Sequence, residues 1–105
     1  MTPDLHEKMR LELIIESPAL RRAEDILLEA NVTGWTVVPA VSGYNGQRRW
    51  SRGTDISAST DMMVLICVSD AEFLLPCLSR LHNLLKRHIG VLDLMSVQVL
   101  RDAEF

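Results

Sequence analysis

Three arginines within five positions are the residues in this sequence that most clearly suggest chemistry. They lie in the arginine-rich segment, residues 42–60, which reads SGYNGQRRWSRGTDISAST and also holds three glycines and two aromatic residues. The planar fork of arginine suits phosphate or carboxylate oxygens, and glycines let backbone N–H groups approach an anion closely. The residues that we assign to anion or phosphate binding are Ser42, Arg48, Arg49 and Arg52.

The length of the arginine-rich segment supports the same assignment. The segment shows neither helical nor strand periodicity over its 19 residues. A stretch this long without regular structure is uncommon in a small domain and is usually functional or disordered. We therefore predict an anion-binding loop that is disordered until a ligand binds. The alternative is a solvated loop whose charges serve only solubility.

The other residues capable of chemistry do not form a catalytic pattern. Cys67 and Cys77 lie in apolar surroundings without metal-binding spacing, so we interpret them as small core hydrophobes in a reducing compartment. His88 stands at the basic end of a predicted helix, where it is expected to interact with the helix dipole. Asp55, within the segment, and Asp61, just after it, lack the pairing that acid–base catalysis needs. We predict no catalytic residue, no metal site and no enzyme.

The composition sets wider limits on function. The 105 residues are 48% hydrophobic and 24% charged, which is typical of one globular domain. The formal net charge of −3 lacks the overall positive field of a protein that coats nucleic acid, so anion binding must be local. No apolar run approaches the roughly 18 residues of a membrane span. We expect a soluble, cytoplasmic protein made of a single domain.

The first elements that must position these residues are a strand and a helix. Residues 9–16 alternate between apolar and charged side chains, which predicts a strand preceded by a tail over residues 1–8. Ser17 is the predicted N-cap of a helix whose first helical residue is Pro18, where the missing N–H costs nothing. Asn31 is the predicted left-handed C-cap of that helix.

Two further strands flank the arginine-rich segment. Residues 34–41 are β-branched and aromatic, and Pro39 places this strand at an edge or a bend because proline cannot donate to a ladder. Residues 62–68 form an almost unbroken apolar run, which predicts a strand buried on both faces. A capping-box pattern at Ser69 and Glu72 then predicts the start of a second helix.

The remaining elements complete a recognisable order. The second helix has a predicted apolar stripe of Leu74, Leu78, Leu81, Leu85 and His88. Pro76 is expected to kink it or to force a non-standard turn, and Gly90 to end it before a last strand over residues 91–100. The resulting βαββαβ order predicts an α+β, ferredoxin-like sandwich with both helices on one face of an antiparallel sheet. Since the other face would remain apolar, we also predict a homo-oligomer.

The chain from residue 9 onward resembles the PII signalling proteins and their PII-like relatives. The resemblance is carried by residues 31–47, NVTGWTVVPAVSGYNGQ, in which a threonine–glycine–aromatic–threonine turn opens the second strand and leads into a loop bearing glycines. The arginine-rich segment corresponds to the T-loop of that family. The resemblance implies a homotrimer with adenine-nucleotide clefts between subunits, and a T-loop that reports to a partner.

The resemblance also implies a set of nucleotide-binding residues. Gly34, Trp35 and Thr36 would hold the base and ribose from one subunit. Gly43 and Tyr44, with Ile89 and Gly90, would contribute from its neighbour. Arg101 would contact a phosphate.

Two departures from the family pattern narrow the expected ligand. The family's Gly-Asp-Gly-Lys loop before the last strand is replaced here by Gly90-Val91-Leu92-Asp93, so the phosphate-cradling lysine is missing. Exchanging a lysine for an aspartate weakens triphosphate binding through like-charge repulsion. The segment also lacks the tyrosine at the family's uridylylation position. By resemblance to the PII-like branch, we expect ADP or AMP rather than ATP, with bicarbonate as a further ligand.

Several functions are compatible with these patterns. The leading hypothesis is a regulator in inorganic-carbon uptake or carbon fixation whose T-loop contacts a target transporter or enzyme. A classical PII regulator of nitrogen metabolism and ammonium transport is an alternative. An RNA-binding module of the same element order is another, but it would require exposed aromatic residues on the central strands, and residues 9–16 and 62–68 contain none. A small oligomeric enzyme of this fold would need a nucleophile or base that the sequence does not offer.

Overall fold

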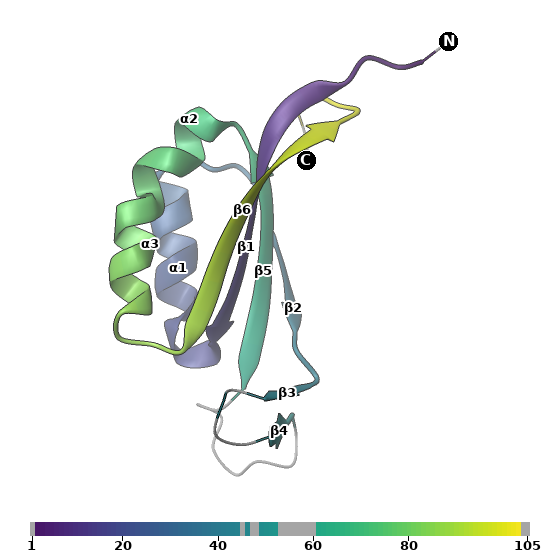
Figure 1. The fold of residues 1–105 in the computed structure, drawn as a ribbon. Coiled ribbons are helices and arrows are strands. Elements are labelled where there is room, and N and C mark those ends of the chain that lie inside the picture. The colour runs from purple at the N-terminus through teal and green to yellow at the C-terminus, as the bar shows by residue number, and fades with distance from the viewer. Residues whose placement is uncertain (1, 45, 47–48, 53–60, 104–105) are drawn as a thin grey trace.

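A computed structural model describes residues 2–44, 46, 49–52 and 61–103 of the chain. Two helical segments cover one face of a four-stranded antiparallel sheet with the order β2-β5-β1-β6 (Figure 1), which confirms the predicted ferredoxin-like α+β sandwich. The elements are β1 (His6–Glu16), α1 (Ser17–Glu29), β2 (Thr36–Pro39), β3 (Ser42–Tyr44), β4 (Arg49–Ser51), β5 (Met62–Ser69), α2 (Ala71–Leu74), η2 (Leu75–Cys77), α3 (Leu78–Leu85) and β6 (Gly90–Val99).

Strand β1 is the central element of the sheet. It pairs with β5 along one side and with β6 along the other. Its alternating side chains Leu11, Leu13 and Ile15 are fully buried under the helices, as the period of two predicts. The strand begins at His6, because that residue still pairs with Val99 of β6. The prediction of a tail over residues 1–8 is therefore wrong for its last three residues.

Helix α1 packs its small and aliphatic side chains on the sheet. Ala19, Ala23, Ile26 and Leu27 are buried at helical spacing. The predicted N-cap is wrong by one residue, because Ser17 is already helical and Glu16, with an extended backbone, takes the cap position without a side-chain hydrogen bond. Pro18 lies in the first turn as expected.

The predicted C-cap of α1 is wrong by one residue, because Ala30 takes that position, but Asn31 is left-handed as expected. Asn31 has a φ of 66°, which is the left-handed conformation that asparagine tolerates better than most residues. The chain then closes back on the helix, because the N–H of Val32 donates to the Leu27 carbonyl over 3.1 Å. This turn leads the chain from the helix layer into the loop before β2.

The second helical stretch is divided by Pro76, as its position predicts. Asp70 rather than Ser69 is the N-cap of α2, and the three residues of η2 form a 3₁₀ turn before α3. A 3₁₀ turn has three residues per turn instead of 3.6, so it changes the phase of the buried stripe. The buried residues are Leu74, Cys77, Leu81 and Leu84. The predicted stripe is therefore correct at Leu74 and Leu81. It is shifted elsewhere, because Leu78 and Leu85 are only partly buried against the core and His88 is not in the helix.

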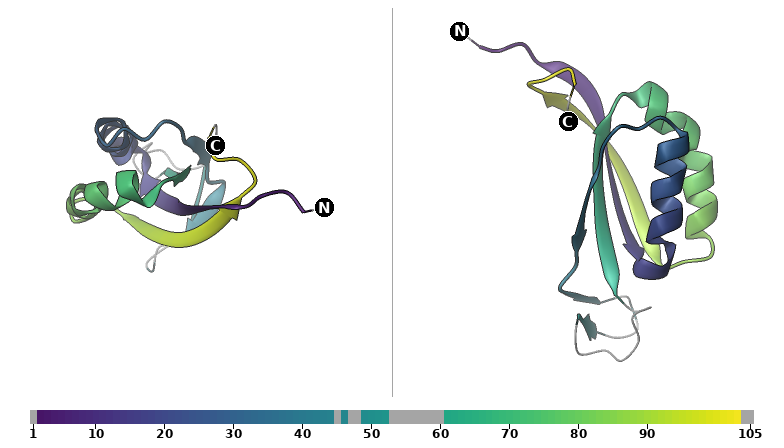
Figure 2. Two further views of the ribbon diagram at one scale, coloured as in Figure 1. Left: turned by 90° about the horizontal axis from the view of Figure 1, so that it is seen from above. Right: turned by 180° about the vertical axis from the view of Figure 1, so that it is seen from behind.

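The face of the sheet opposite the helices is only partly covered in one chain (Figure 2). Strand β5 alternates between buried residues under the helices and half-buried residues on this outer face. Val38 is 41% exposed, Val91 54% and Met95 52%. The prediction that β5 is buried on both faces thus does not hold within a single chain. A single copy leaves an apolar surface that the predicted homo-oligomer would cover.

Candidate functional site

A cleft of about 430 Å³ lies at the root of the arginine-rich segment, which we name the root cleft. Five of the predicted nucleotide- and anion-binding residues line it together, although they come from two separate parts of the sequence. They are Ser42, Gly43, Tyr44, Ile89 and Gly90. Its lining residues come from β3 and β4, from the end of β1 and from the starts of β5 and β6.

The floor of the root cleft follows from strand register. Ile14 of β1 faces Val64 of β5 on one side and Val91 of β6 on the other. Directly opposed residues in a sheet share a face, so these three side chains form one apolar surface on the outer face. All three line the cleft. Sequence reasoning did not select them, because register is not visible in a single strand.

Trp50 is the largest side chain of the root cleft, and it was also missed as a site residue. The tryptophan lies in β4 directly opposite Gly43 of β3. A Cβ atom on Gly43 would lie 2.7 Å from the indole ring, so only glycine lets the ring rest on the β3 backbone. The two short strands show that the segment has regular structure at Ser42–Tyr44 and Arg49–Ser51, contrary to its lack of periodicity.

Gly90 is required on the opposite side of the cleft for a similar reason. A Cβ atom there would lie 2.7 Å from the Ile14 carbonyl oxygen and 2.8 Å from the Leu85 side chain. The residues before Gly90 are tied to the end of β1. The Glu16 N–H donates to the Ile89 carbonyl over 3.0 Å, and His88 Nδ1 lies 2.7 Å from a Glu16 carboxylate oxygen. His88 thus holds the turn before β6 and is not a helix-end residue, because α3 ends at Leu85.

The guanidinium group of Arg52 is held by the protein itself, although 33% of the side chain stays exposed. Its Nε donates to the Ala40 carbonyl over 3.0 Å, and one Nη donates to the Met62 carbonyl over 2.9 Å. Its other Nη forms an ion pair with Asp61 at 3.2 Å. These contacts join the end of β2 to the start of β5, which are the two points where the segment leaves and re-enters the sheet. A ligand-binding role for Arg52 stays a prediction.

The other two predicted arginines of the segment are Arg49 and Arg48. Arg49 is exposed in β4, next to Trp50. Arg48 lies outside the described residues, so its predicted contact with an anion has no structural counterpart here. Among the described residues that line the root cleft, none is a lysine or an arginine.

The remaining predicted residues lie toward the other end of the sheet. The Trp35 indole donates to a Glu24 carboxylate over 2.9 Å, and the Gly34 carbonyl accepts a hydrogen bond from the Cys67 thiol. Thr36 begins β2, and Arg101 follows the far end of β6 (Figure 2). A single chain therefore does not bring Gly34, Trp35, Thr36 or Arg101 into the root cleft.

The pKa shifts of ionisable groups away from the cleft have structural causes, which are burial and hydrogen bonding. Burial raises the pKa of the Cys67 thiol to about 11, and Cys77 adds to this effect. Burial also raises the pKa of Cys77. Hydrogen bonds to Asp70 and Asp102 raise the pKa of Lys8, and the same contact lowers the pKa of Asp102. Both thiols are therefore protonated near neutral pH and poor nucleophiles.

Metal centres and membrane-spanning helices are two other classes of functional feature. No group of three or more histidine, cysteine, aspartate or glutamate side chains is arranged to hold a metal ion in the part of the chain that the structure describes. No described helix is long and apolar enough to cross a membrane.

Comparison with known proteins gives a family match over almost the whole chain. The family model described as nitrogen regulatory protein P-II matches residues 8–104. Among curated proteins, none matches the sequence.

Solved structures give a consistent match. CPII, a nitrogen regulatory PII-like protein from Thiomonas intermedia K12 bound to ADP, AMP and bicarbonate, superposes with a TM-score of 0.84 at 25% identity, over 95% of this chain and 94% of that one. CPII bound to ADP and bicarbonate gives a TM-score of 0.81 at 26% identity, covering 95% of each chain. A DUF3240 family protein from Shewanella baltica OS155 shares the fold, with a TM-score of 0.61 at 12% identity over 92% of this chain and 96% of that one.

Proposed function

The chain belongs to the nitrogen regulatory protein P-II family, and on that premise we propose that it senses ADP or AMP, together with bicarbonate, in clefts between the subunits of a homotrimer. It is a PII-like signalling protein. The observation that carries the proposal is the root cleft, in which the base of the arginine-rich segment and the residues before β6 form one concave surface.

The root cleft has the size and character of a nucleotide-base site. Its volume of about 430 Å³ falls within the range of small-molecule sites. The aliphatic side chains of Ile14, Val64 and Val91 and the ring of Trp50 offer an apolar surface to a planar base. Ser42 also lines the cleft, and its hydroxyl can donate a hydrogen bond to a base or ribose and accept one.

The charge of the root cleft favours a ligand with few phosphates. The described lining residues include no cation, and Asp93 stands where the family has its phosphate-cradling lysine. Each added phosphate brings negative charge that the described lining residues do not neutralise, so ADP and AMP are preferred over ATP. Arg48 and Arg49 of the segment and Arg101 of a neighbouring subunit supply the positive charge for the phosphates and for bicarbonate.

The second half of each site comes from a neighbouring subunit. In one chain, Gly34, Trp35 and Thr36 lie just before and at the start of β2 and do not line the root cleft. The half-exposed outer face of the sheet gives neighbouring copies an apolar surface to pack on. Three copies joined through this face bring the Gly34–Thr36 turn of one subunit to the root cleft of the next.

Signalling follows from the position of the cleft. Ser42, Gly43, Tyr44 and Trp50 belong both to the cleft and to the arginine-rich segment, so a ligand that contacts them changes which conformations the segment adopts. The segment, acting as a T-loop, then contacts a target transporter or enzyme. The solved relative that binds ADP, AMP and bicarbonate supports a role in inorganic-carbon uptake or carbon fixation.

Calorimetry on the intact protein tests this proposal. AMP, ADP, ATP and cyclic AMP are titrated separately, each with and without bicarbonate, and light scattering measures the oligomer. We expect ADP and AMP to bind more tightly than ATP, and bicarbonate to change their affinity. The absence of binding by every nucleotide at millimolar concentration would overturn the proposal.

A matched pair of variants locates the ligand. Val91→Asp places a negative charge in the root cleft and should weaken ADP binding about tenfold or more. Leu28→Asp makes the same kind of change at a similarly exposed position on α1, outside the cleft, and should bind ADP like the unmodified protein. Equal affinity in both variants would place the nucleotide elsewhere.

A further inference from the structure

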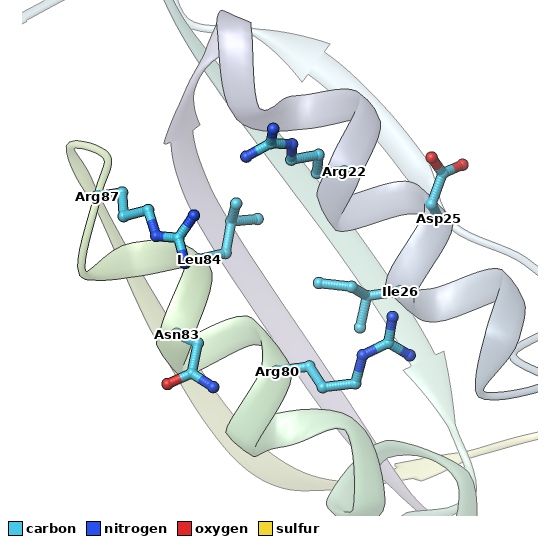
Figure 3. A pocket seen from close by; sticks show the side chains of 7 residues that line it. All are labelled: Arg22, Asp25, Ile26, Arg80, Asn83, Leu84 and Arg87. Carbon is cyan, nitrogen blue, oxygen red and sulfur yellow. The ribbon is translucent and has the colours of Figure 1, made fainter.

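A second concave surface lies between the two helices, on the side of the helix layer that faces away from the sheet (Figure 3). It encloses about 340 Å³, and we name it the arginine groove. Arg22 of α1 reaches into it from one side, and Arg80 of α3 and Arg87, just beyond α3, reach into it from the other. Arg22 and Arg87 point toward one another across the groove.

Two of the three guanidinium groups have no acidic partner within the described part of the chain. Arg80 forms an ion pair with Glu29. No ion pair or hydrogen bond joins the side chains of Arg22 or Arg87 to another described residue. The carboxylate of Asp25, which also lines the groove, lies 3.9 Å from Arg21 on the neighbouring turn. The groove is therefore locally positive in a chain whose net charge is −3.

The floor of the groove is apolar. Ile26 of α1 and Leu84 of α3 lie at its base, with exposed fractions of only 8% and 7%. The small exposed area that remains is bordered by guanidinium groups and by Asn83, which can both donate and accept hydrogen bonds. A ligand that fits such a site has an apolar side chain at its centre and carboxylates around it.

The groove stays accessible in the assembly proposed above. The helices cover one face of the sheet, while the apolar face expected to pack between copies is the opposite one (Figure 2). The root cleft also opens at the end of the sheet and not between the helices. A partner bound in the groove would therefore compete neither with subunit packing nor with the nucleotide.

We propose that the arginine groove is a docking site for an acidic peptide segment of a partner protein. An aliphatic or aromatic side chain of that segment packs on Ile26 and Leu84. Its flanking carboxylates pair with Arg22 and Arg87, whose forked guanidinium groups can donate two parallel hydrogen bonds to a carboxylate. The long side chains of the arginines add apolar area along the walls.

Selection from displayed random peptides tests this proposal, because it requires no knowledge of the partner. The intact protein is the bait, and peptides that also bind the double variant R22E/R87E are removed. The peptides that remain are labelled, and their affinity is measured by fluorescence anisotropy. We expect them to combine glutamate or aspartate with one apolar residue, and to bind R22E/R87E about tenfold or more weakly.

A second double variant provides the matched control. R21E/K86E changes two cations immediately beside the groove-lining pair, by the same total charge, without altering a groove residue. It should bind the selected peptides within about twofold of the unmodified protein, as expected for charges outside the contact. Circular dichroism and ADP titration show that both variants fold and keep the root cleft.

Three results would overturn the proposal. The first is that no peptide is enriched. The second is that the enriched peptides carry no acidic residue. The third is that R21E/K86E weakens binding as much as R22E/R87E, which would show attraction to general surface charge and not docking in the groove.

Discussion

The root cleft and the arginine groove differ in what builds them. The root cleft is shaped by backbone, because Gly43 and Gly90 allow close approach and strand register places its apolar floor. The groove is shaped by long side chains on the outside of two helices. The cleft carries almost no charge of its own, whereas the groove is positive. The cleft therefore cannot change without changing the fold, while the groove can change and leave the fold intact.

The largest expected effect tests whether the root cleft is part of the fold. Gly90→Ala places a methyl group against the Ile14 carbonyl and the Leu85 side chain. We expect the free energy of unfolding to fall by about 2–3 kcal/mol, since both neighbours must move. Urea denaturation at one fixed protein concentration measures this. The nucleotide affinity of the folded fraction should fall as well.

Ser96→Thr is the control for Gly90→Ala. It also adds one methyl group in β6, but at an exposed position, and should change stability by less than about 0.5 kcal/mol. If Gly90→Ala were as stable as the unmodified protein, the root cleft could change without changing the fold. The contrast drawn above with the arginine groove would then be wrong.

The second prediction concerns arginines within one segment. Arg52→Ala removes the guanidinium donor from the Ala40 carbonyl and from the half-buried Asp61, and it leaves the Met62 carbonyl with only the Ala40 N–H as donor. The free energy of unfolding should therefore fall by about 1–2 kcal/mol. Arg52→Lys keeps the charge but not the fork, and should recover only part of this loss. Arg49→Ala, at an exposed position, should leave stability unchanged within about 0.5 kcal/mol.

Ligand titration completes that test. Arg49→Ala should weaken ADP binding although it leaves the stability nearly unchanged. If Arg52→Lys were as stable as the unmodified protein, the contacts of Arg52 would be incidental, and its assignment to anion binding would regain support.

Salt provides a third and smaller contrast. Raising sodium chloride from about 50 mM to about 300 mM should lower the affinity of the selected acidic peptides by about three- to tenfold, because their contacts are exposed ion pairs. The affinity for AMP in the largely apolar root cleft should fall by about twofold or less. Fluorescence anisotropy measures how the peptide affinity depends on salt concentration, and calorimetry measures the same dependence for AMP. If the affinity for AMP fell more steeply with salt than the affinity for the peptides, the root cleft and not the arginine groove would be the more charged site.

The smallest expected effect concerns the stability cost of the groove. Arg22 and Arg87 face one another without a described acidic partner, so replacing both by alanine should leave the free energy of unfolding equal or raise it by up to about 0.5 kcal/mol. Urea denaturation checks this. A clear loss of stability would mean that these arginines hold the helices together and are not kept for a partner.

The fold could be predicted because its signals are local. The alternation of Leu11, Leu13 and Ile15 identified β1, and Pro39 identified an edge strand, which β2 is. The errors arose where one element acts on another. Pairing with β6 extended β1 back to His6, and the 3₁₀ turn at Pro76 shifted the buried stripe of the helix that follows.

The sites were predictable only in part. Family resemblance grouped Gly43 and Gly90, which the structure brings into one cleft. The roles of Trp50 and Val64 depend on register, and a sequence does not give register. The arginine cluster in the sequence drew attention to Arg52, whose charge is paired within the protein. Arg22 and Arg87 stand far apart in the sequence, and only the packing of α1 beside α3 gathers them.

The placement of the two tryptophans has an optical consequence. The sequence contains only Trp35 and Trp50, one at each half of the proposed intersubunit site. Trp50 rests on Gly43 in the root cleft, and Trp35 is hydrogen-bonded to Glu24 near the turn that a neighbouring subunit would present. Each single Trp→Phe variant therefore leaves one fluorophore. Ligand arrival and subunit association could then be followed separately, without an added label.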